Sequence, residues 1–444
     1  MLVNGKQQLK LIHKAKILIS RFENYKFELG RDNSFYLATY SKGIGNLLLK
    51  RLKKNYKISL QDLVALIKDF FYSSYFLNFK IYYSKKTIKS YSKIVISWAF
   101  KKNFEIDGSF NDRYFNINSK QEPNILWYLI YLDKDIPKKI NNNIILYKPI
   151  EKKSFKIGIF TKILLRNFKY LFKDINYFLS NLSSYIFFSK IFSQNLKKKI
   201  NENVKHILIP YEGQPFQNEI IQIFKNKIKI IGYIHSPPLA IPTNFIYKSN
   251  SPDKIILNGE DQLTCFNNLL GWKKDKIKIL PSDRFLKNSK SIKSNIIYFP
   301  LSINSKKKIL SSLMFLLKKK NMELNKFTIQ NHPGAINSKP NIELINEMKM
   351  ILRKNKKKQI KNKEKFSIFI GASGGIVEAL ERGIKVIQIC EDPIFEMYSK
   401  EVWPNIKKEI ISDNIFKYSL LKKGKLIKLG NKPKNLNHYF KSIK

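Results

Sequence analysis

The strongest constraint on this fold is a regular alternation of short apolar runs and amphipathic stretches in the second half of the chain. The apolar runs, rich in Ile, read as strands at 206–210, 227–235, 254–259, 276–281, 296–301, 327–333, 366–370 and 385–389. Stretches with helical spacing separate them, at 218–226, 260–271, 305–320, 341–355 and 376–383. Strands that alternate with helices form parallel sheets covered on both faces, so the sequence predicts an α/β protein.

The first half of the chain shows a weaker version of the same pattern. Strand-like runs occupy 35–40, 93–100, 124–133 and 143–149, and helical patterns occupy 58–76 and 154–202. A chain of 444 residues is long for one core, and the Pro-rich segment 236–244 interrupts regular structure. We therefore expect two Rossmann-like domains facing a cleft: residues 1–240, with a helical insertion at about 154–202, and residues 241–444.

The chain is strongly basic, with a formal net charge of +50 from 83 Lys and Arg against 33 Asp and Glu. Such an excess attracts polyanions in general. Lys, Asn and Ile are abundant throughout and no nucleic-acid-binding motif accompanies the charge, so we interpret it as compositional and do not expect a nucleic-acid partner. Contact of a basic face with an anionic membrane is compatible with either interpretation.

The two cysteines, Cys265 and Cys390, are too few for a disulfide framework and suit a reducing cytosol. The first ten residues lack an apolar signal core, and polar residues interrupt the most apolar region, about 170–192. These features favour a cytoplasmic protein that is soluble or lies peripherally at the inner face of the membrane.

A glycine-rich loop between a strand and a helix, in FSIFIGASGGIVEAL (366–380), is the strongest local signal. Gly371, Gly374 and Gly375 would let an anion approach the N–H groups at the helix start, and Ser373 adds a hydroxyl donor. Glu378, one turn later, could reach ribose hydroxyls. The alternatives are a tight turn without a ligand and a solvated helix carboxylate.

Two further strand ends carry candidate phosphate ligands. His332 and Pro333, in QNHPGA, follow the strand at 327–333, where an imidazole can donate to a phosphate or sugar. Arg284, in LPSDRF, could pair bidentately with a diphosphate. A surface loop and a surface salt bridge are the respective alternatives.

The first half supplies the candidate catalytic groups. Glu212, in YEGQPF, and His235, in GYIHSPP, both follow strands, where a general base could meet an acceptor hydroxyl. Glu212 is the preferred base, and a structural hydrogen bond at a turn is the alternative for each. The loop at 106–116 clusters Asp107, Asp112 and Arg113 with aromatic residues; it is a candidate acceptor pocket to which we assign no chemical role.

The segments YEGQPF, GYIHS, PDKIILNG, LPSDRF, NHPGA and GASGGIVEALERGIKVIQI appear in this order. Together with DGSFNDRYF and NILWYLIYLD, they resemble bacterial surface-carbohydrate biosynthesis proteins and, more distantly, capsule and polysialic-acid glycosyltransferases of GT-B fold. The resemblance covers about 90–400. It implies that His332, Pro333 and Ser373 hold the donor's phosphate and that Glu212 is the base. Tyr211 stands where the distant transferases have a first acid, and Gly374 replaces the second residue of a Ser pair.

These observations predict a GT-B-type, metal-independent glycosyltransferase of surface polysaccharide biosynthesis. It would move a sugar from a nucleotide-activated donor, its substrate, to a glycan or lipid-linked acceptor, without a further cofactor. A nucleotide-sugar epimerase of the same fold, a basic nucleic-acid-binding protein and a non-catalytic scaffold remain as alternatives.

Overall fold

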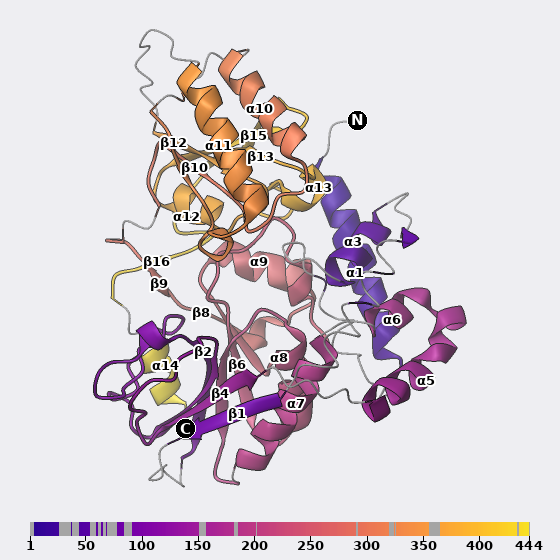
Figure 1. The fold of residues 1–444 in the computed structure, drawn as a ribbon, viewed down its shortest axis with the longest axis vertical. Helices are drawn as coiled ribbons and strands as arrows, with labels where there is room; N and C mark the ends of the chain where they lie inside the picture. Colours follow the sequence, from indigo (N-terminus) through magenta and orange to yellow (C-terminus); the bar gives the residue numbers. More distant parts are fainter. Residues whose placement is uncertain are drawn as a thin grey trace.

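The computed structural model divides into two lobes stacked along the long axis of the molecule (Figure 1). It describes residues 4–25, 37, 44–53, 59–60, 64, 68, 78–83, 91–150, 157–181, 185–200, 202–289, 292–318, 324, 326–354, 365–432 and 435–443. Most of the strand expected at 35–40 and most of the helix expected at 58–76 lie outside these residues.

The lower lobe of Figure 1 contains, within the described residues, an eight-stranded sheet. From edge to edge its strands are β1 (Asn78–Tyr83), β4 (Ile144–Ile150), β3 (Ile125–Tyr131), β2 (Lys93–Ala99), β5 (His206–Pro210), β6 (Lys229–Tyr233), β7 (Lys254–Leu257) and β8 (Ile277–Ile279). All neighbours are parallel except β1, which runs antiparallel to β4 at the edge. Every residue of β3 and β5 is buried, as expected for strands covered on both faces.

The upper lobe contains a six-stranded sheet among the described residues. Its order is β11 (Thr328–Gln330), β10 (Ile296–Tyr298), β12 (Phe366–Ile370), β13 (Lys385–Ile389), β15 (Ile415–Leu420) and β14 (Ile406–Ser412). The first four strands are parallel, whereas β14 and β15 form an antiparallel hairpin that the sequence analysis did not anticipate. The α/β class and the two Rossmann-like sheets are thus confirmed.

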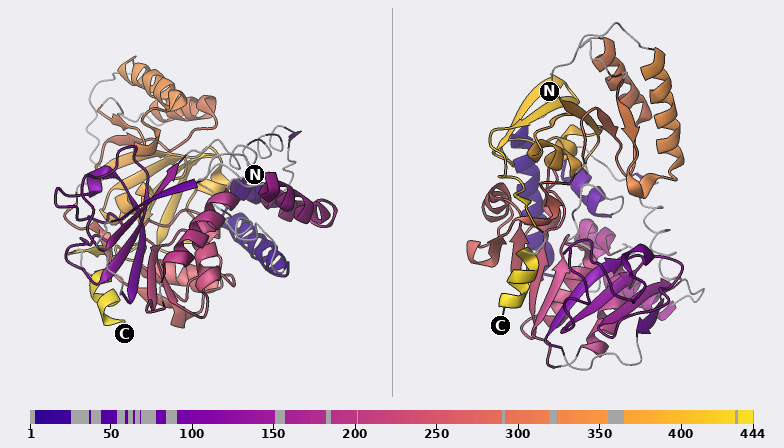
Figure 2. Two further views of the ribbon diagram at one scale, coloured as in Figure 1. Left: turned by 60° about the horizontal axis from the view of Figure 1, so that its bottom comes forward. Right: turned by 90° about the vertical axis from the view of Figure 1, so that its left-hand side faces the viewer.

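The predicted helical stretches at 154–202, 218–226, 260–271, 305–320, 341–355 and 376–383 contain helices, whereas the helices at 5–23, 44–52, 393–396 and 435–442 were not anticipated. The helices of the described residues are α1 (Gly5–Glu23), α3 (Ile44–Leu52), α5 (Ile157–Lys173), α6 (Ile175–Ser180), α7 (Tyr185–Lys199), α8 (Pro215–Phe224), α9 (Glu260–Asn268), α10 (Lys306–Lys318), α11 (Lys339–Lys354), α12 (Gly375–Glu381), α13 (Pro393–Glu396) and α14 (Asn435–Ser442). In the upper lobe α10 and α11 lie side by side on one face (Figure 2). Helices α5, α6 and α7 occupy the segment expected to be a helical insertion.

The expected division at residue 240 does not coincide with the boundary between the sheets. Strands β7 and β8 extend the lower sheet beside β6, so this sheet continues to Ile279. Helix α14 also returns to the lower lobe, where Leu436 and Phe440 join the buried cluster that contains Trp127. Sequence periodicity identifies strands but does not show which strands pair with one another. The Pro-rich segment is therefore a loop within the lower lobe and does not mark a domain boundary.

A short parallel pair, β9 (Ser282–Leu286) with β16 (Leu429–Gly430), links the lobes. The segment that follows β8 therefore forms a further strand, which the sequence analysis did not anticipate. Asp283 in β9 is fully buried; its carboxylate accepts from the backbone N–H groups of Asn435 (3.0 Å) and Leu436 (2.9 Å). This carboxylate satisfies the first N–H groups of α14 and anchors the helix.

Buried contacts hold the two lobes together. The Tyr398 hydroxyl lies 2.9 Å from the carbonyl oxygen of Pro238 in the lower lobe and 3.3 Å from that of Ser373 in the upper lobe. Trp403 donates through Nε1 to the Ala240 carbonyl at 3.1 Å. Helix α1 runs beside both lobes, and Gln8 at its start donates to the Met397 carbonyl at 2.7 Å (Figure 1).

Candidate functional site

A cavity of about 410 Å³ lies between the lobes, at the carboxyl ends of their parallel strands. Ligands of open α/β sheets bind at this edge, because loops leaving neighbouring strands converge there. The cavity collects most of the predicted site residues: Glu212, Arg284, His332, Gly371, Ser373, Gly374, Gly375 and Glu378. Pro333 follows the lining residue His332 as the first residue of a short 3₁₀ turn.

Glu212 enters the cavity from the turn after β5, and its carboxylate is well supported. Oε1 lies 3.2 Å from Nε2 of His235, and Oε2 accepts from Gln214 Nε2 at 2.5 Å. The adjacent Gly213 has φ +70°, and an added Cβ would lie 2.2 Å from the carbonyl oxygen of Asn244. Only glycine fits this conformation and this close approach, so the turn that presents Glu212 is tightly specified.

Burial would raise the pKa of Glu212, but the hydrogen bond and charge of His235, the hydrogen bond from Gln214 and the charge of Arg284 outweigh it. The pKa therefore lies below its usual value, and the group is ionised at neutral pH. His235 is 5% exposed and does not line the cavity; the edge of its ring packs on Tyr114, with centroids 4.4 Å apart. Its position suits a residue that orients Glu212 from behind.

His332 is oriented by its own loop. Its Nδ1 accepts from the Gly334 N–H at 3.0 Å, so the neutral ring carries its proton on Nε2. Desolvation by partial burial lowers the pKa of His332, which favours this neutral form. Asn331 fixes the loop: its Oδ1 accepts from the His332 N–H at 2.9 Å and from Asn341 Nδ2 at 3.0 Å. The imidazole of His332 is therefore oriented so that its Nε2–H can donate a hydrogen bond.

The glycine-rich loop between β12 and α12 offers unpaired donors. Within the described residues, the backbone N–H groups of Ala372, Ser373 and Gly374 donate to no protein acceptor. The Gly375 N–H, in contrast, donates to Ser373 Oγ at 3.2 Å. Helix α12 spans only seven residues, so its dipole contributes less than the sequence analysis assumed. Anion binding here depends on the loop N–H groups.

Glu378 and Arg284 differ in how firmly they are held. Glu378 is buried, and its Oε1 accepts from Arg382 Nε at 3.0 Å and Nη2 at 2.8 Å. This pairing makes Glu378 a structural carboxylate at the cavity wall. Arg284 is exposed, with its guanidinium carbon 5.9 Å from the centroid of the Tyr114 ring. It is positioned to meet a charged ligand in the cavity.

The three candidate acceptor residues are not among the residues that line the cavity. Asp112 is buried and accepts from the backbone N–H groups of Tyr114 and Phe115, both at 2.7 Å, and burial raises its pKa to about 6. Asp107 accepts from Ser109 and pairs with Lys120, and Arg113 is exposed. Tyr114, from the same loop at 106–116, is the residue that contacts the site, because its ring packs on His235.

Two carboxyl groups of the cavity, those of Glu391 and Glu396, were not predicted from the sequence. Glu391 accepts from the backbone N–H groups of Asn304 and Ser305. Glu396 is nearly buried, and burial, with the nearby charges of Glu391 and Asp392, raises its pKa to about 8. Both follow β13, so the strand-end argument applied to His332 would also have found Glu391.

No cluster of three or more His, Cys, Asp or Glu that could hold a metal ion occurs among the described residues. In the same part of the chain, no helix combines the length and the apolar character needed to cross a bilayer.

Comparisons with known proteins found little similarity. No family model matches the sequence, and no curated protein matches it. One similar solved structure is that of the wall teichoic acid polymerase TagF, at a TM-score of 0.30 and 12% sequence identity, covering 69% of this chain and 70% of that chain. A similarity of this size assigns neither a fold nor an activity to this chain.

Proposed function

We propose that this protein is a glycosyltransferase that moves a sugar from a nucleotide-activated donor to a hydroxyl of a glycan or lipid-linked acceptor in surface polysaccharide synthesis. One observation carries the proposal: a single interlobe cavity is lined by an ionised carboxylate, Glu212, and by neutral phosphate donors, namely His332 and the loop at 371–375. A general base and an anion-binding wall are the two elements that such a transfer requires.

In the proposed reaction, Glu212 accepts the proton of the acceptor hydroxyl while that oxygen forms a bond to the anomeric carbon of the sugar. The bond from this carbon to the donor's phosphate oxygen breaks, and the electron pair leaves with the nucleotide. Nε2–H of His332, the N–H groups of Ala372, Ser373 and Gly374, and Arg284 stabilise the developing negative charge. No metal ion is required in this scheme.

Peripheral contact with an anionic membrane is part of the proposal, and α5 supports it. This helix exposes Leu165 (78%), Phe168 (58%) and Phe172 (82%), three apolar side chains spaced along one side. Exposed cationic residues accompany them: Arg166, Lys169 and Lys173. Helix α5 lies at the margin of the molecule (Figure 1). Apolar and basic side chains in this arrangement suit the interface of an anionic bilayer.

A thermal-shift screen with CMP-, UDP-, GDP- and ADP-sugars tests the donor site, because a ligand that binds the folded state raises its stability with concentration. We expect one nucleotide class to raise the melting temperature and His332→Ala to reduce that shift. Incubation with the donor alone then separates transfer from epimerisation. Release of an altered nucleotide sugar without any acceptor would contradict transfer.

A further inference from the structure

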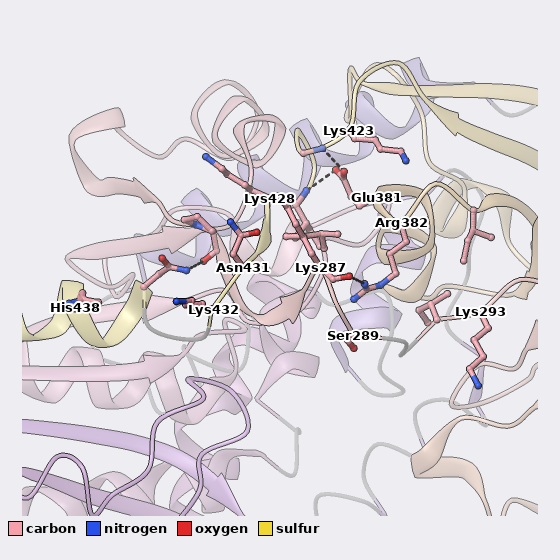
Figure 3. Close-up of a pocket in the computed structure, with 17 residues that line it drawn as sticks. Lys287, Ser289, Lys293, Glu381, Arg382, Lys423, Lys428, Asn431, Lys432 and His438 are labelled. Carbon is pink, nitrogen blue, oxygen red and sulfur yellow. Dashed lines mark hydrogen bonds between the residues drawn. The ribbon is translucent and has the colours of Figure 1, made fainter.

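A second, larger cavity lies beyond the Glu378–Arg382 pair. It measures about 1160 Å³ and shares no lining residue with the candidate site: Glu378 lines the smaller cavity and Arg382 the larger one. Its walls come from the chain around β9 and β16, the segment before β10, the end of α12 and the start of α14 (Figure 3). We call this cavity the basic groove.

The basic groove collects lysine side chains that form no ion pair within the part of the chain that the structure describes. Lysines from three separate segments line it: Lys287, Lys293, Lys423, Lys428 and Lys432 (Figure 3). All five are exposed, and within the described residues none of their ammonium groups forms an ion pair or a hydrogen bond. A concave surface with charges of one sign concentrates the electrostatic potential and raises the local concentration of anions.

Glu381, the one carboxylate among the described residues that line the basic groove, does not offset these charges. Glu381 is buried, and its oxygens accept from the backbone N–H groups of Gly424 (2.5 Å), Leu426 (2.9 Å) and Ile427 (3.0 Å). These bonds turn it toward the backbone of the loop before β16 (Figure 3). Glu381 therefore shapes the loop that carries Lys423 and Lys428 and forms no ion pair with the five lysines.

The wall of the basic groove is apolar between the lysines. Ile292, Ile384 and Leu429 line it, together with Pro281, and all four are partly exposed. These contacts would add no binding free energy for an inorganic anion. The organic part of a larger ligand would gain binding free energy, because apolar surface would be removed from water. The volume is close to that of small-molecule sites, so a discrete ligand suits it better than a long polymer.

We propose that the basic groove binds a small organic anion that carries two or more phosphoryl groups, at a site separate from the donor cavity. The lysines pair with the phosphoryl groups, and the apolar wall contacts the organic part. This site does not depend on the transferase activity proposed above.

Binding of ATP and of inorganic tripolyphosphate, measured by calorimetry at physiological salt, tests the proposal. The variant K287Q/K428Q/K432Q removes three lysines of the basic groove, and the matched control K307Q/K349Q/K354Q removes three exposed lysines of α10 and α11. We expect at least a tenfold loss of ATP affinity in the first variant and less than a twofold change in the control. Equal losses in both variants, or none in the first, would overturn the proposal.

Two further measurements keep the outcome clear. ATP should protect Lys287, Lys428 and Lys432 of the unmodified protein from acetylation, as read by mass spectrometry, which does not depend on how a variant folds. ATP should also bind more tightly than tripolyphosphate; equal affinities would overturn the contribution of the apolar wall. Binding of the donor identified by thermal shift should persist in K287Q/K428Q/K432Q, so failure of the donor site and failure of the basic groove give different results.

Discussion

The carboxylate of Glu212 lies 3.2 Å from Nε2 of His235, and the two residues follow neighbouring parallel strands, β5 and β6. Glu212 reaches the cavity, whereas His235 lies behind it, packed on Tyr114. The sequence offered these residues as rival bases. Their geometry assigns them complementary positions, with Glu212 facing the ligand and His235 orienting it.

Replacement of Glu212 by Gln removes the proposed base and preserves the size of the side chain. We expect kcat to fall at least about 100-fold, the usual contribution of a general base, with little change in donor affinity. Transfer assays with the donor found by thermal shift measure both quantities. Glu343→Gln, at an exposed position of α11, is the control and should be fully active. An active Glu212→Gln enzyme would rule out this assignment.

Replacement of His332 by Ala removes the Nε2–H donor. We expect donor affinity to fall about 10- to 150-fold, since a hydrogen bond to a charged phosphate contributes roughly 1.5–3 kcal/mol. Nucleotide titration by calorimetry measures the change. His13→Ala, at an exposed position of α1, should bind normally. If both variants bind alike, the phosphate does not contact His332.

Replacement of Gly213 by Ala should destabilise the protein by about 3 kcal/mol, because the new Cβ combines a strained φ with a clash. Gly424 provides the comparison: its φ of +80° is equally positive, but nothing lies within 4 Å of the added Cβ. Gly424→Ala should therefore cost only about 1–2 kcal/mol. Denaturant unfolding of the two variants measures these changes in the free energy of unfolding. Equal losses of stability in both variants would refute the role of the Asn244 contact.

The titration of Glu396 should make the free energy of unfolding depend on pH. Its pKa is raised to about 8 in the folded protein from 4.5, so the folded state keeps a proton that the unfolded chain releases between these values. The free energy of unfolding therefore falls as pH rises from about 4.5 to 8. Glu396→Gln does not titrate, and its melting temperature should exceed that of the native protein by more at pH 8 than at pH 5. A difference independent of pH would contradict the shift.

The apolar side of α5 can be tested with lipid vesicles. We expect L165S/F168S/F172S to bind phosphatidylglycerol vesicles about 100-fold more weakly than the native protein, since burying each of the three side chains contributes on the order of 1 kcal/mol. The control I336S/I342S/M350S removes three exposed apolar side chains elsewhere. Equal binding of both variants, or equal binding of the native protein to phosphatidylcholine, would exclude this membrane contact.

Strand ends were the most informative sequence signal. Ile-rich runs located the parallel strands, and parallel strands open their carboxyl ends onto one edge. This reasoning placed Glu212, His332 and the loop at 371–375 near a cleft, and one cavity collects them.

The pairing of strands and the roles of several polar residues depend on the tertiary structure, and the hydrophobic pattern of the sequence does not predict them. The pairing of β7 and β8 with β6 depends on sheet edges, which periodicity does not encode. Asp283, in LPSDRF, was assigned no role from the sequence, yet it caps a helix about 150 residues later in the chain. Asp112 reads as a binding residue but orders its own loop. Polar residues that hold distant backbone groups leave no local signature.

The return of α14 to the lower lobe affects how the protein can fold during synthesis. Leu436 and Phe440 complete a cluster whose other members, such as Trp127, emerge from the ribosome hundreds of residues earlier. The upper sheet is made in between. The N-terminal lobe therefore stays unfinished until translation has passed both lobes, so maturation of the two is coupled rather than sequential.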